Sequence, residues 1–376
     1  MAVHTDPADT GDEPASLHKR ARRMPKVLLH EHLDGGLRVA TLLALLRERG
    51  ITPPADDEDL LAAWFDARAH AGSLDEYLRG FALTVAAMAT PEGLARVAFE
   101  AAEDARADGC VLAEFRIAPL LFEAHGVPAK VAVQALLAGL ARSPLPSGLI
   151  VCALRHEDEA SVARAAALAL QFHHRPGPAG LPRVIGFDLA GPETGFPATR
   201  HARLLCQLRD EGLGLTLHAG EADVGERVLE AARLGAQRIG HGVRLADLID
   251  GPDAAAQLAE LKALGVHLEV CPTSNLHTGA AASMARHPIH ALWRAGLSLS
   301  FHTDNRLMSR VTQSSEAVGL LQAGFGWPEL LRMGLDAAQA SFLPEAQRAT
   351  ARSALLDWAG QQGLAPAPRG SPTRLA

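Results

Sequence analysis

Short apolar segments recur along the chain, and helical periodicity follows most of them. Each segment spans four to six residues, which is typical of strands that are buried on both faces of a parallel sheet. The eight segments are 27–30, 110–115, 149–154, 184–189, 213–218, 238–241, 266–271 and 297–301. Stretches rich in Ala, Leu, Arg and Glu have the helical period between them, for example 93–107, 128–142, 157–172 and 223–234.

Eight strand-then-helix units predict an α/β fold, a (β/α)8 TIM barrel. A doubly wound open sheet is the alternative, but it usually carries a G-x-G-x-x-G turn after the first strand, and none follows 27–30. Helical patterns at 38–49 and 59–88 precede the second strand, and another covers 312–360. We therefore expect additional helices after strand 1, over the C-terminal mouth of the barrel, and at the C-terminus.

The length of 376 residues would fit two or three domains, but no break in composition marks a linker. We therefore expect one barrel domain over 23–362, flanked by flexible tails at 1–22 and 363–376. The basic run 19–23 could contact an acidic partner, although such runs are usually only solvated.

Charge and hydropathy exclude several classes of partner. The net charge of −7 argues against a nucleic-acid binder, and no apolar run reaches the ~18 residues of a membrane helix. The first 22 residues also lack the apolar segment of a signal peptide. We expect a cytoplasmic protein that binds a small molecule, as a monomer or weak homo-oligomer.

Cysteine and histidine usage limits the chemistry of any metal site. The four cysteines are too far apart for a C-x-x-C cluster, whereas the chain contains 17 histidines. A bound metal should therefore have histidine and carboxylate ligands.

The end of the first predicted strand carries the sequence His30-Glu31-His32. Side chains alternate along a strand, so His30 and His32 point to one face and Glu31 to the other. Two imidazoles on one face can share a metal ion, or they can be ordinary barrel residues.

Three other strand ends carry polar residues of the same kind. His218 and Glu221 follow strand 5, His241 ends strand 6, and Asp304 follows strand 8. Barrel enzymes place their chemistry at the C-terminal ends of the strands, so a closed barrel would bring these residues together. Three neutral imidazoles and one carboxylate suit Zn²⁺, one ion per subunit, which lowers the pKa of a bound water from ~15.7 toward ~7.

Under this assignment two groups remain for proton transfer. The Glu221 carboxyl lies three residues beyond His218 and is not needed as a ligand. His241 is a second proton-transfer or orienting group.

Six motifs, taken in order, resemble those of the adenosine deaminase family, a mononuclear-zinc branch of the amidohydrolase barrels. The resemblance extends from about residue 25 to 345. The motifs are KVLLHEHLDG at 26–35, DLAGPE at 188–193, HAGE at 218–221, GHG at 240–242, EVCPTSN at 269–275 and TDNRLMS at 303–309.

The resemblance implies a role for each site residue. It implies that His30, His32, His218 and Asp304 bind zinc, with His32 also facing the substrate and Asp304 also catalytic. Glu221 would donate a proton to purine N1, and His241 would activate or orient the water. Gly191 would contact the purine through its backbone, Asp34 would bond the ribose 5′-hydroxyl, and Asn305 would face purine N7.

Two positions depart from the family pattern, and one region is ambiguous. Asn305 replaces a frequent Asp, and its amide can donate a hydrogen bond to N7, whereas an Asp would first have to be protonated. His302 replaces a frequent Asn and either tunes the metal site or fills the barrel.

The helical region 59–81 could form an apolar wall over the nucleoside or simply pack against other helices. Its apolar residues are Trp64, Phe65, Leu74, Tyr77, Leu78 and Phe81.

The sequence thus predicts zinc-dependent hydrolytic deamination of adenosine and 2′-deoxyadenosine to the corresponding inosines, with release of ammonia. Deamination of adenine or of aminodeoxyfutalosine is the alternative. A binuclear amidohydrolase is disfavoured because no lysine lies near 187–191 to bridge two metals. The sequence also lacks G-x-S-x-G and the paired H-x-E and P-C-x-x-C motifs. A catalytically inactive barrel that binds nucleosides remains an alternative from another class.

Overall fold

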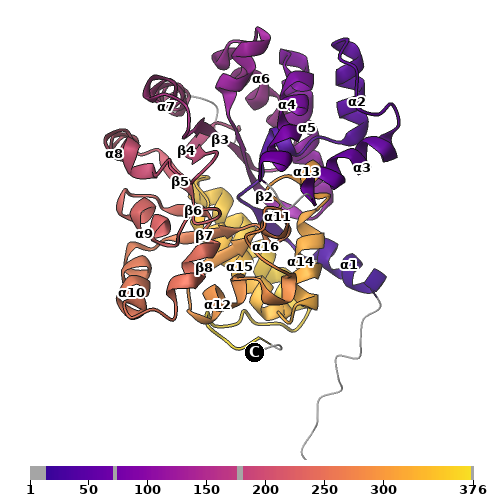
Figure 1. Ribbon diagram of the computed structural model, residues 1–376. Helices are drawn as coiled ribbons and strands as arrows, with labels where there is room; N and C mark the ends of the chain where they lie inside the picture. The colour runs from indigo at the N-terminus through magenta and orange to yellow at the C-terminus, as the bar shows by residue number, and fades with distance from the viewer. Residues whose placement is uncertain (1–13, 71–73, 176–180, 374–376) are drawn as a thin grey trace, which may run out of the picture.

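The structure is a computed structural model that describes residues 14–70, 74–175 and 181–373. Within these residues, eight parallel strands pair in chain order, and Figure 1 shows them at the centre of a ring of helices. The strands are β1 (Lys26–Leu28), β2 (Cys110–Ile117), β3 (Ser147–Leu154), β4 (Val184–Ala190), β5 (Gly214–Ala219), β6 (Arg238–His241), β7 (His267–Val270) and β8 (Ser298–Phe301). All eight predicted strands are confirmed, with bounds that differ by at most two residues.

Backbone hydrogen bonds between the segments after β1 and β8 join the two ends of the sheet. Glu31 and Asp304 form a parallel bridge. The His32 amide donates to the Asp304 carbonyl at 2.7 Å, and the Asp304 amide donates to the His30 carbonyl at 3.0 Å. The predicted TIM barrel is therefore confirmed, and three of the residues that join its ends, His30, His32 and Asp304, are predicted site residues.

Helices connect successive strands, and most of them lie on the outside of the barrel. The helix directly before β2 is α5 (Pro91–Ala107). The helices between β2 and β8 are α6 (Ala129–Leu140), α7 (Glu159–His173), α8 (Ala202–Asp210), α9 (Glu226–Arg233), α10 (Ala254–Leu264), α11 (Pro272–His277) and α12 (Ile289–Arg294). Local sequence sets their starts; for example, the Thr90 side chain accepts the Gly93 amide and Pro91 occupies the first turn of α5. Short 3-10 helices are η1 (Leu33–Gly35), η2 (Pro119–His125), η3 (Ala198–His201), η4 (Val243–Leu248) and η5 (Met284–Arg286).

The additional helices lie where the sequence predicts them. Those between β1 and β2 are α2 (Val39–Glu48), α3 (Glu58–Ala69) and α4 (Leu74–Met88). Those after β8 are α13 (Arg306–Ser309), α14 (Gln313–Gln322), α15 (Trp327–Ala340) and α16 (Glu345–Gln361). Because α15 packs on β8 and β1, it covers the region where the barrel closes.

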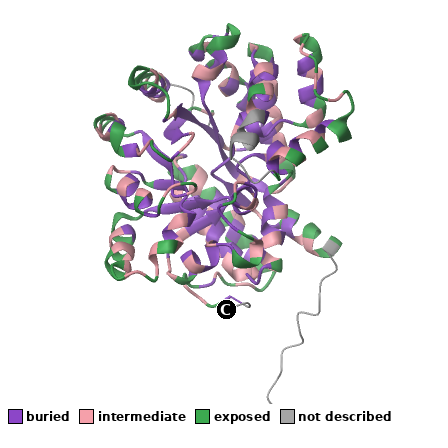
Figure 2. Ribbon diagram, in the orientation of Figure 1, coloured by how far each residue is buried: buried purple, intermediate pink, exposed green. Residues whose placement is uncertain are grey.

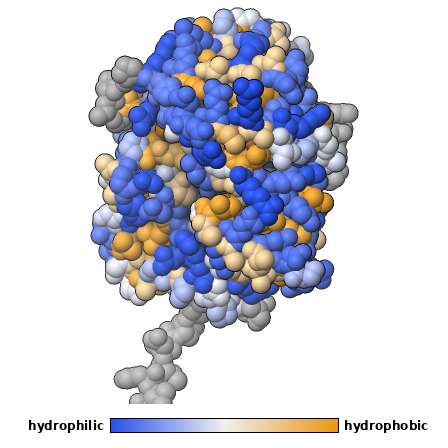
Figure 3. All heavy atoms as spheres, turned by 90° about the vertical axis from the view of Figure 1, so that its left-hand side faces the viewer, coloured by the Kyte–Doolittle hydropathy of each residue, from blue (hydrophilic) through white to orange (hydrophobic). Residues whose placement is uncertain are grey.

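Burial follows this layering. Figure 2 shows a buried centre made of the strands and of the inner faces of the helices, with exposed residues on the outer faces. The face that carries α7 to α10 is mostly hydrophilic, with separate apolar patches (Figure 3). Among the described residues, no single helix is long and apolar enough to cross a membrane; by length and composition only, the bent pair Pro119–His125 and Ala129–Leu140 might.

Both predicted tails differ from the structure where it describes them. At the N-terminus, α1 (Pro14–Arg23) packs against α14. Its Ala21 is buried, and its Arg20 lies over the ring of Trp327, the first residue of α15, at 4.6 Å. The predicted flexible tail at 1–22 is therefore corrected for 14–22, and 1–13 lie outside the described residues.

The C-terminal segment also packs on the barrel. Arg369 donates to both oxygens of buried Asp336 at 2.7 and 2.9 Å, and the Trp293 indole donates to the Ser371 carbonyl at 2.9 Å. The flexible tail predicted for 363–376 is thus corrected up to residue 373, because fixed polar partners hold this segment; 374–376 lie outside the described residues.

Removal of the C-terminal segment should destabilise the protein. A chain that ends at Gly363 leaves buried Asp336 without Arg369 and the Trp293 indole without its acceptor. We expect the free energy of unfolding to fall by about 1–3 kcal/mol. Urea denaturation would measure it, and an unchanged midpoint would show that the packed segment contributes no stability.

Candidate active site

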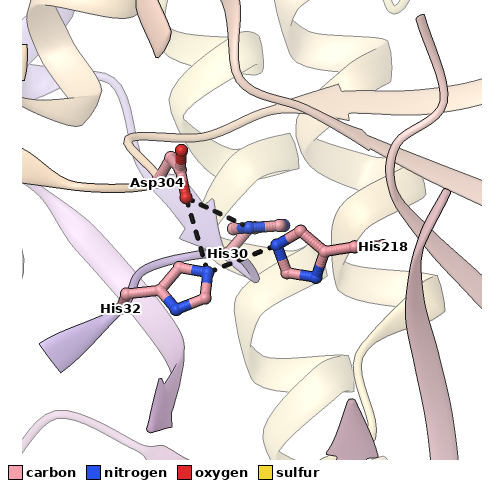
Figure 4. Close-up of side chains that lie close together, drawn as sticks. All are labelled: His30, His32, His218 and Asp304. Carbon is pink, nitrogen blue, oxygen red and sulfur yellow. Dashed lines mark hydrogen bonds and ion pairs between the residues drawn. The ribbon is translucent and has the colours of Figure 1, made fainter. Parts of the chain in front are cut away.

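Three imidazoles and one carboxylate converge at the C-terminal end of the barrel (Figure 4). His30 and His32 follow β1, His218 lies in β5 and Asp304 follows β8. Asp304 Oδ1 lies 3.3 Å from His30 Nε2 and 3.5 Å from His32 Nε2, and His32 Nε2 lies 3.3 Å from His218 Nε2. The structure therefore brings together the four ligands that the sequence predicts.

Carboxylates behind two of these rings set their orientation. His30 Nδ1 lies 2.9 Å from Glu269 Oε2, and His218 Nδ1 lies 2.9 Å from Asp188 Oδ2. A ring that donates its Nδ1 proton to a carboxylate presents a lone pair at Nε2. His30 Nε2 is buried and makes no hydrogen bond. Lone pairs that face a carboxylate oxygen repel one another, so the arrangement fits a cation at their centre.

The donor set fits one divalent metal. One donor atom from each of the four residues lies within 4.8 Å of the others. A second group shares His30 and Asp304 but replaces the other two ligands by His241 and Cys271. Because burial raises the pKa of the Cys271 thiol well above its usual value, this thiol is a poor ligand, and the first group is favoured.

A buried arginine supports both orienting carboxylates. Arg116 of β2 pairs with Asp188 at 2.8 Å and with Glu269 at 2.6 Å, and it also donates to the Leu29 carbonyl at 2.8 Å. All three charged side chains are completely buried. Although burial opposes ionisation, Arg116 and Arg238 hold the pKa of Glu269 well below its usual value.

Glu221 lies beside the four candidate metal ligands. Its Oε2 is 3.4 Å from His241 Nε2, and its Oε1 accepts the Thr278 hydroxyl at 2.9 Å. Burial raises the pKa of Glu221, and the carboxylates of Asp304 and Glu193 raise it further. The protonated carboxyl therefore persists to higher pH than in an exposed glutamate. The amide of Asn275 orients His241, with its Nδ2 at 3.1 Å from His241 Nδ1.

A cavity of about 520 Å³ opens over these groups. Polar side chains line its floor, and apolar residues from α4, η2 and β3 line its wall. The lining residues are His32, Asp34, Phe81, Ala82, Val85, Ala118, Leu121, Ala124, His125, Cys152, Leu154, His156, Ala190, Gly191, Pro192, His218, Glu221, His241, Thr278, Asp304 and Asn305.

Two polar side chains of this lining have buried oxygens without a partner. Asp34 Oδ1 and Asn305 Oδ1 make no hydrogen bond, and burial raises the pKa of Asp34 to about 7. Gly35 allows Asn305 its position, because a Cβ at Gly35 would lie 2.0 Å from Asn305 Oδ1. Gly191 has φ +89°, a conformation that glycine adopts readily.

Comparison with known proteins assigns the family. The family model described as adenosine deaminase matches residues 25–358. Proteins named adenosine deaminase from Mycobacterium bovis and Mycobacterium marinum are 43% and 42% identical to this chain, over 87% and 86% of it and 92% and 91% of their own lengths. The chain belongs to the adenosine deaminase family. It is accordingly a hydrolytic deaminase, as the sequence motifs predict.

Solved structures share the fold of this family member. The adenine deaminase of Arthrobacter aurescens is 25% identical with a TM-score of 0.79, over 90% of this chain and 99% of its own. An amidohydrolase from Burkholderia ambifaria, solved with bound zinc, is 24% identical with a TM-score of 0.80, over 95% and 96% of the two chains.

The apolar residues of 59–81 divide between the two alternatives that the sequence left open. Phe81 lines the cavity, but Trp64 and Phe65 do not. Phe65 is buried, and the Trp64 ring lies 3.5 Å from the Arg68 guanidinium, so both pack within the helical cap. The side chains of Leu74, Tyr77 and Leu78 lie outside the described residues.

The hydrogen bonds of His302 do not involve any of the four candidate ligands. Its Nδ1 accepts the Leu29 amide at 3.2 Å, and its Nε2 lies 2.6 Å from the Ser300 hydroxyl. Burial keeps the pKa of His302 well below its usual value. Its hydrogen bonds therefore identify it as a neutral residue of the barrel interior that joins β1 to β8.

Loss of the buried arginine should destabilise the protein strongly. Arg116→Met leaves Asp188 and Glu269 buried without their shared cation, and we expect a loss of about 3–5 kcal/mol in the free energy of unfolding. Chemical denaturation would measure the loss. Arg106→Met, which removes the exposed Arg106–Glu103 pair, is the matched control and should leave stability nearly unchanged. Equal effects of the two substitutions would contradict a supporting role for Arg116.

Proposed function

We propose that this enzyme hydrolyses adenosine and 2′-deoxyadenosine to inosine and 2′-deoxyinosine with release of ammonia. One observation carries the proposal: the Glu221 carboxyl group, whose side chain is only 13% exposed, shares a cavity with His32, His218 and Asp304, three of the four candidate ligands. The relatives named adenosine deaminase, at up to 43% identity, support the choice of substrate.

We propose that the metal is one Zn²⁺ per chain, held by His30, His32, His218 and Asp304. Three imidazole nitrogens and one carboxylate oxygen suit zinc, and the unpartnered His30 Nε2 needs a cation rather than a hydrogen bond. When bound, zinc lowers the pKa of a coordinated water, so that a nucleophile is available near neutral pH.

The reaction also requires a proton donor, because purine C6 becomes tetrahedral only as ring aromaticity is lost. We assign the donor role to Glu221, which gives its proton to N1 while water oxygen bonds to C6. His241, 3.4 Å from Glu221, orients the attacking water and accepts its proton together with Asp304. His241 and Asp304 return that proton to the amino group as the C6–N bond breaks and ammonia leaves, and the C6 hydroxyl gives its proton to Glu221 as the C6=O bond forms.

The cavity favours a neutral nucleoside over a nucleotide. Its described lining contains no lysine or arginine, whereas Asp34, Glu221 and Asp304 are carboxyl groups. A phosphate there would have no arginine or lysine to pair with, only imidazoles such as those of His125 and His156, and it would face three carboxyl groups. The lone Asp34 Oδ1 suits the 5′-hydroxyl of a ribose, while Gly191 and Asn305 contact the purine. A free base such as adenine would leave Asp34 without a partner.

A substrate panel tests the proposal. Ultraviolet absorbance would follow adenosine, 2′-deoxyadenosine, adenine, AMP and aminodeoxyfutalosine with the zinc-loaded enzyme. We expect turnover of the first two at far higher kcat/KM. Turnover of adenine or aminodeoxyfutalosine alone would replace the substrate and keep the reaction, and a chain inactive on every compound would be a binding protein.

Glu221→Gln should retain zinc and lose activity. An amide cannot give its proton to N1, so we expect kcat to fall roughly 10²- to 10⁴-fold. In the parent enzyme kcat/KM should fall as pH rises through the raised pKa of Glu221, because only the protonated form is the donor. Steady-state kinetics from pH 5 to 10 and metal analysis would measure both effects. Near-parental turnover in the variant would remove Glu221 from the mechanism.

Asp34→Ala should separate nucleosides from the free base. Loss of a hydrogen bond to the 5′-hydroxyl should raise KM for adenosine roughly 10- to 100-fold. Any slow turnover of adenine should be unchanged, because adenine has no ribose. Parallel kinetics with adenosine, 5′-deoxyadenosine and adenine would measure this, and an equal effect on adenosine and 5′-deoxyadenosine would place the ribose elsewhere.

A further inference from the structure

We propose that Glu193 is a positioning residue that holds the Glu221 loop in its productive shape. The inference rests on the proposed role of Glu221 as proton donor. Glu193 belongs to the DLAGPE motif after β4, and its carboxyl group is buried beneath the loop that follows β5.

Four consecutive backbone N–H groups of that loop donate to Glu193. The donors are Gly220 at 3.1 Å, Glu221 at 3.2 Å, Ala222 at 3.3 Å and Asp223 at 3.0 Å. Successive N–H groups that point inward form a concave anion-binding turn. In this chain the anion is the protein's own carboxylate, so the turn requires no external ligand to satisfy its donors.

The Glu193 carboxylate holds the Glu221 backbone, while the Thr278 hydroxyl holds the Glu221 side chain. The Glu221 amide lies 3.2 Å from both Glu193 oxygens, and Thr278 donates to Glu221 Oε1. Gly220, the first donor of the turn, has φ +68°. A Cβ at this position would lie 2.7 Å from a methyl group of Val228, so the backbone conformation of the turn requires glycine here.

Glu193 is separate from the candidate metal ligands. Among its hydrogen bonds, none reaches His30, His32, His218 or Asp304. A Glu193 substitution should therefore misplace the proton donor without removing the metal. Misplacement of a reacting group by about 1 Å costs up to about 10²-fold in rate.

The test uses Glu193→Gln and Glu193→Asp in the zinc-loaded enzyme. Gln keeps the length but replaces one acceptor oxygen by a donor that opposes the Glu221 amide, and Asp keeps the charge but is too short to reach all four donors. We expect kcat for adenosine to fall roughly 10- to 100-fold in both variants, with KM changed less than about threefold and zinc content unchanged. Adenosine kinetics, metal analysis and thermal melting would be measured on each.

Glu329→Gln is the matched control, because Glu329 also accepts a backbone amide, that of Gly326, outside the cavity lining. It should leave kcat unchanged. The combination Glu193→Gln with Glu221→Gln should be no slower than Glu221→Gln alone, because Glu193 acts through Glu221.

Several outcomes would overturn the proposal. They are a parental kcat in Glu193→Asp, a loss confined to KM or zinc content, and multiplicative losses in the double variant. If Glu193→Gln does not fold, Glu193→Asp alone decides. The proton-donor assignment fails separately, through an active Glu221→Gln, so the two failures are distinguishable.

Discussion

The double ion pair of Arg116 is the interaction on which the rest of the site depends. One buried guanidinium neutralises Asp188 and Glu269, which orient His218 and His30 from opposite parts of the barrel. Without that cation Asp188 would lose its only arginine partner among the described residues, and Glu269 would retain only Arg238, 2.6 Å away. The geometry of the imidazole cluster is therefore fixed by a charge balance on β2, a strand that contributes no ligand.

Much of the fold and site could be predicted from the sequence, because strand periodicity and ligand chemistry are local. His30 and His32 differ by two positions in the segment that follows β1, and the other polar residues end or follow the predicted apolar segments. The Arg116 network could not be predicted in this way. Asp188 and Glu269 begin two of the family motifs, but they lie 72 and 153 positions from Arg116, and no local pattern indicates that the three residues pair.

The prediction of two flexible tails was wrong where the structure describes them, for a related reason. Pro, Gly and Arg in 363–376 are typical of a frayed end, yet Asp336 and Trp293 supply partners that only the folded barrel presents. Arg20, from the basic run of α1, likewise packs over the Trp327 ring. The composition of a segment does not show which residues of the folded barrel will contact it, and these contacts decide whether the segment is ordered. For the same reason, Trp64 and Phe65 pack within the helical cap instead of lining the cavity.

The β-bridge between Glu31 and Asp304, which closes the barrel, also brings the candidate ligands from the two ends of the sheet together. Asp304 joins the last strand to the first through its backbone and faces His30 and His32 with its side chain. A nascent chain has both histidines that follow β1 long before residue 304 is made. The four candidate ligands therefore come together only after the segment that follows β8 has docked beside β1, so tight binding of a metal by all four would require a closed barrel.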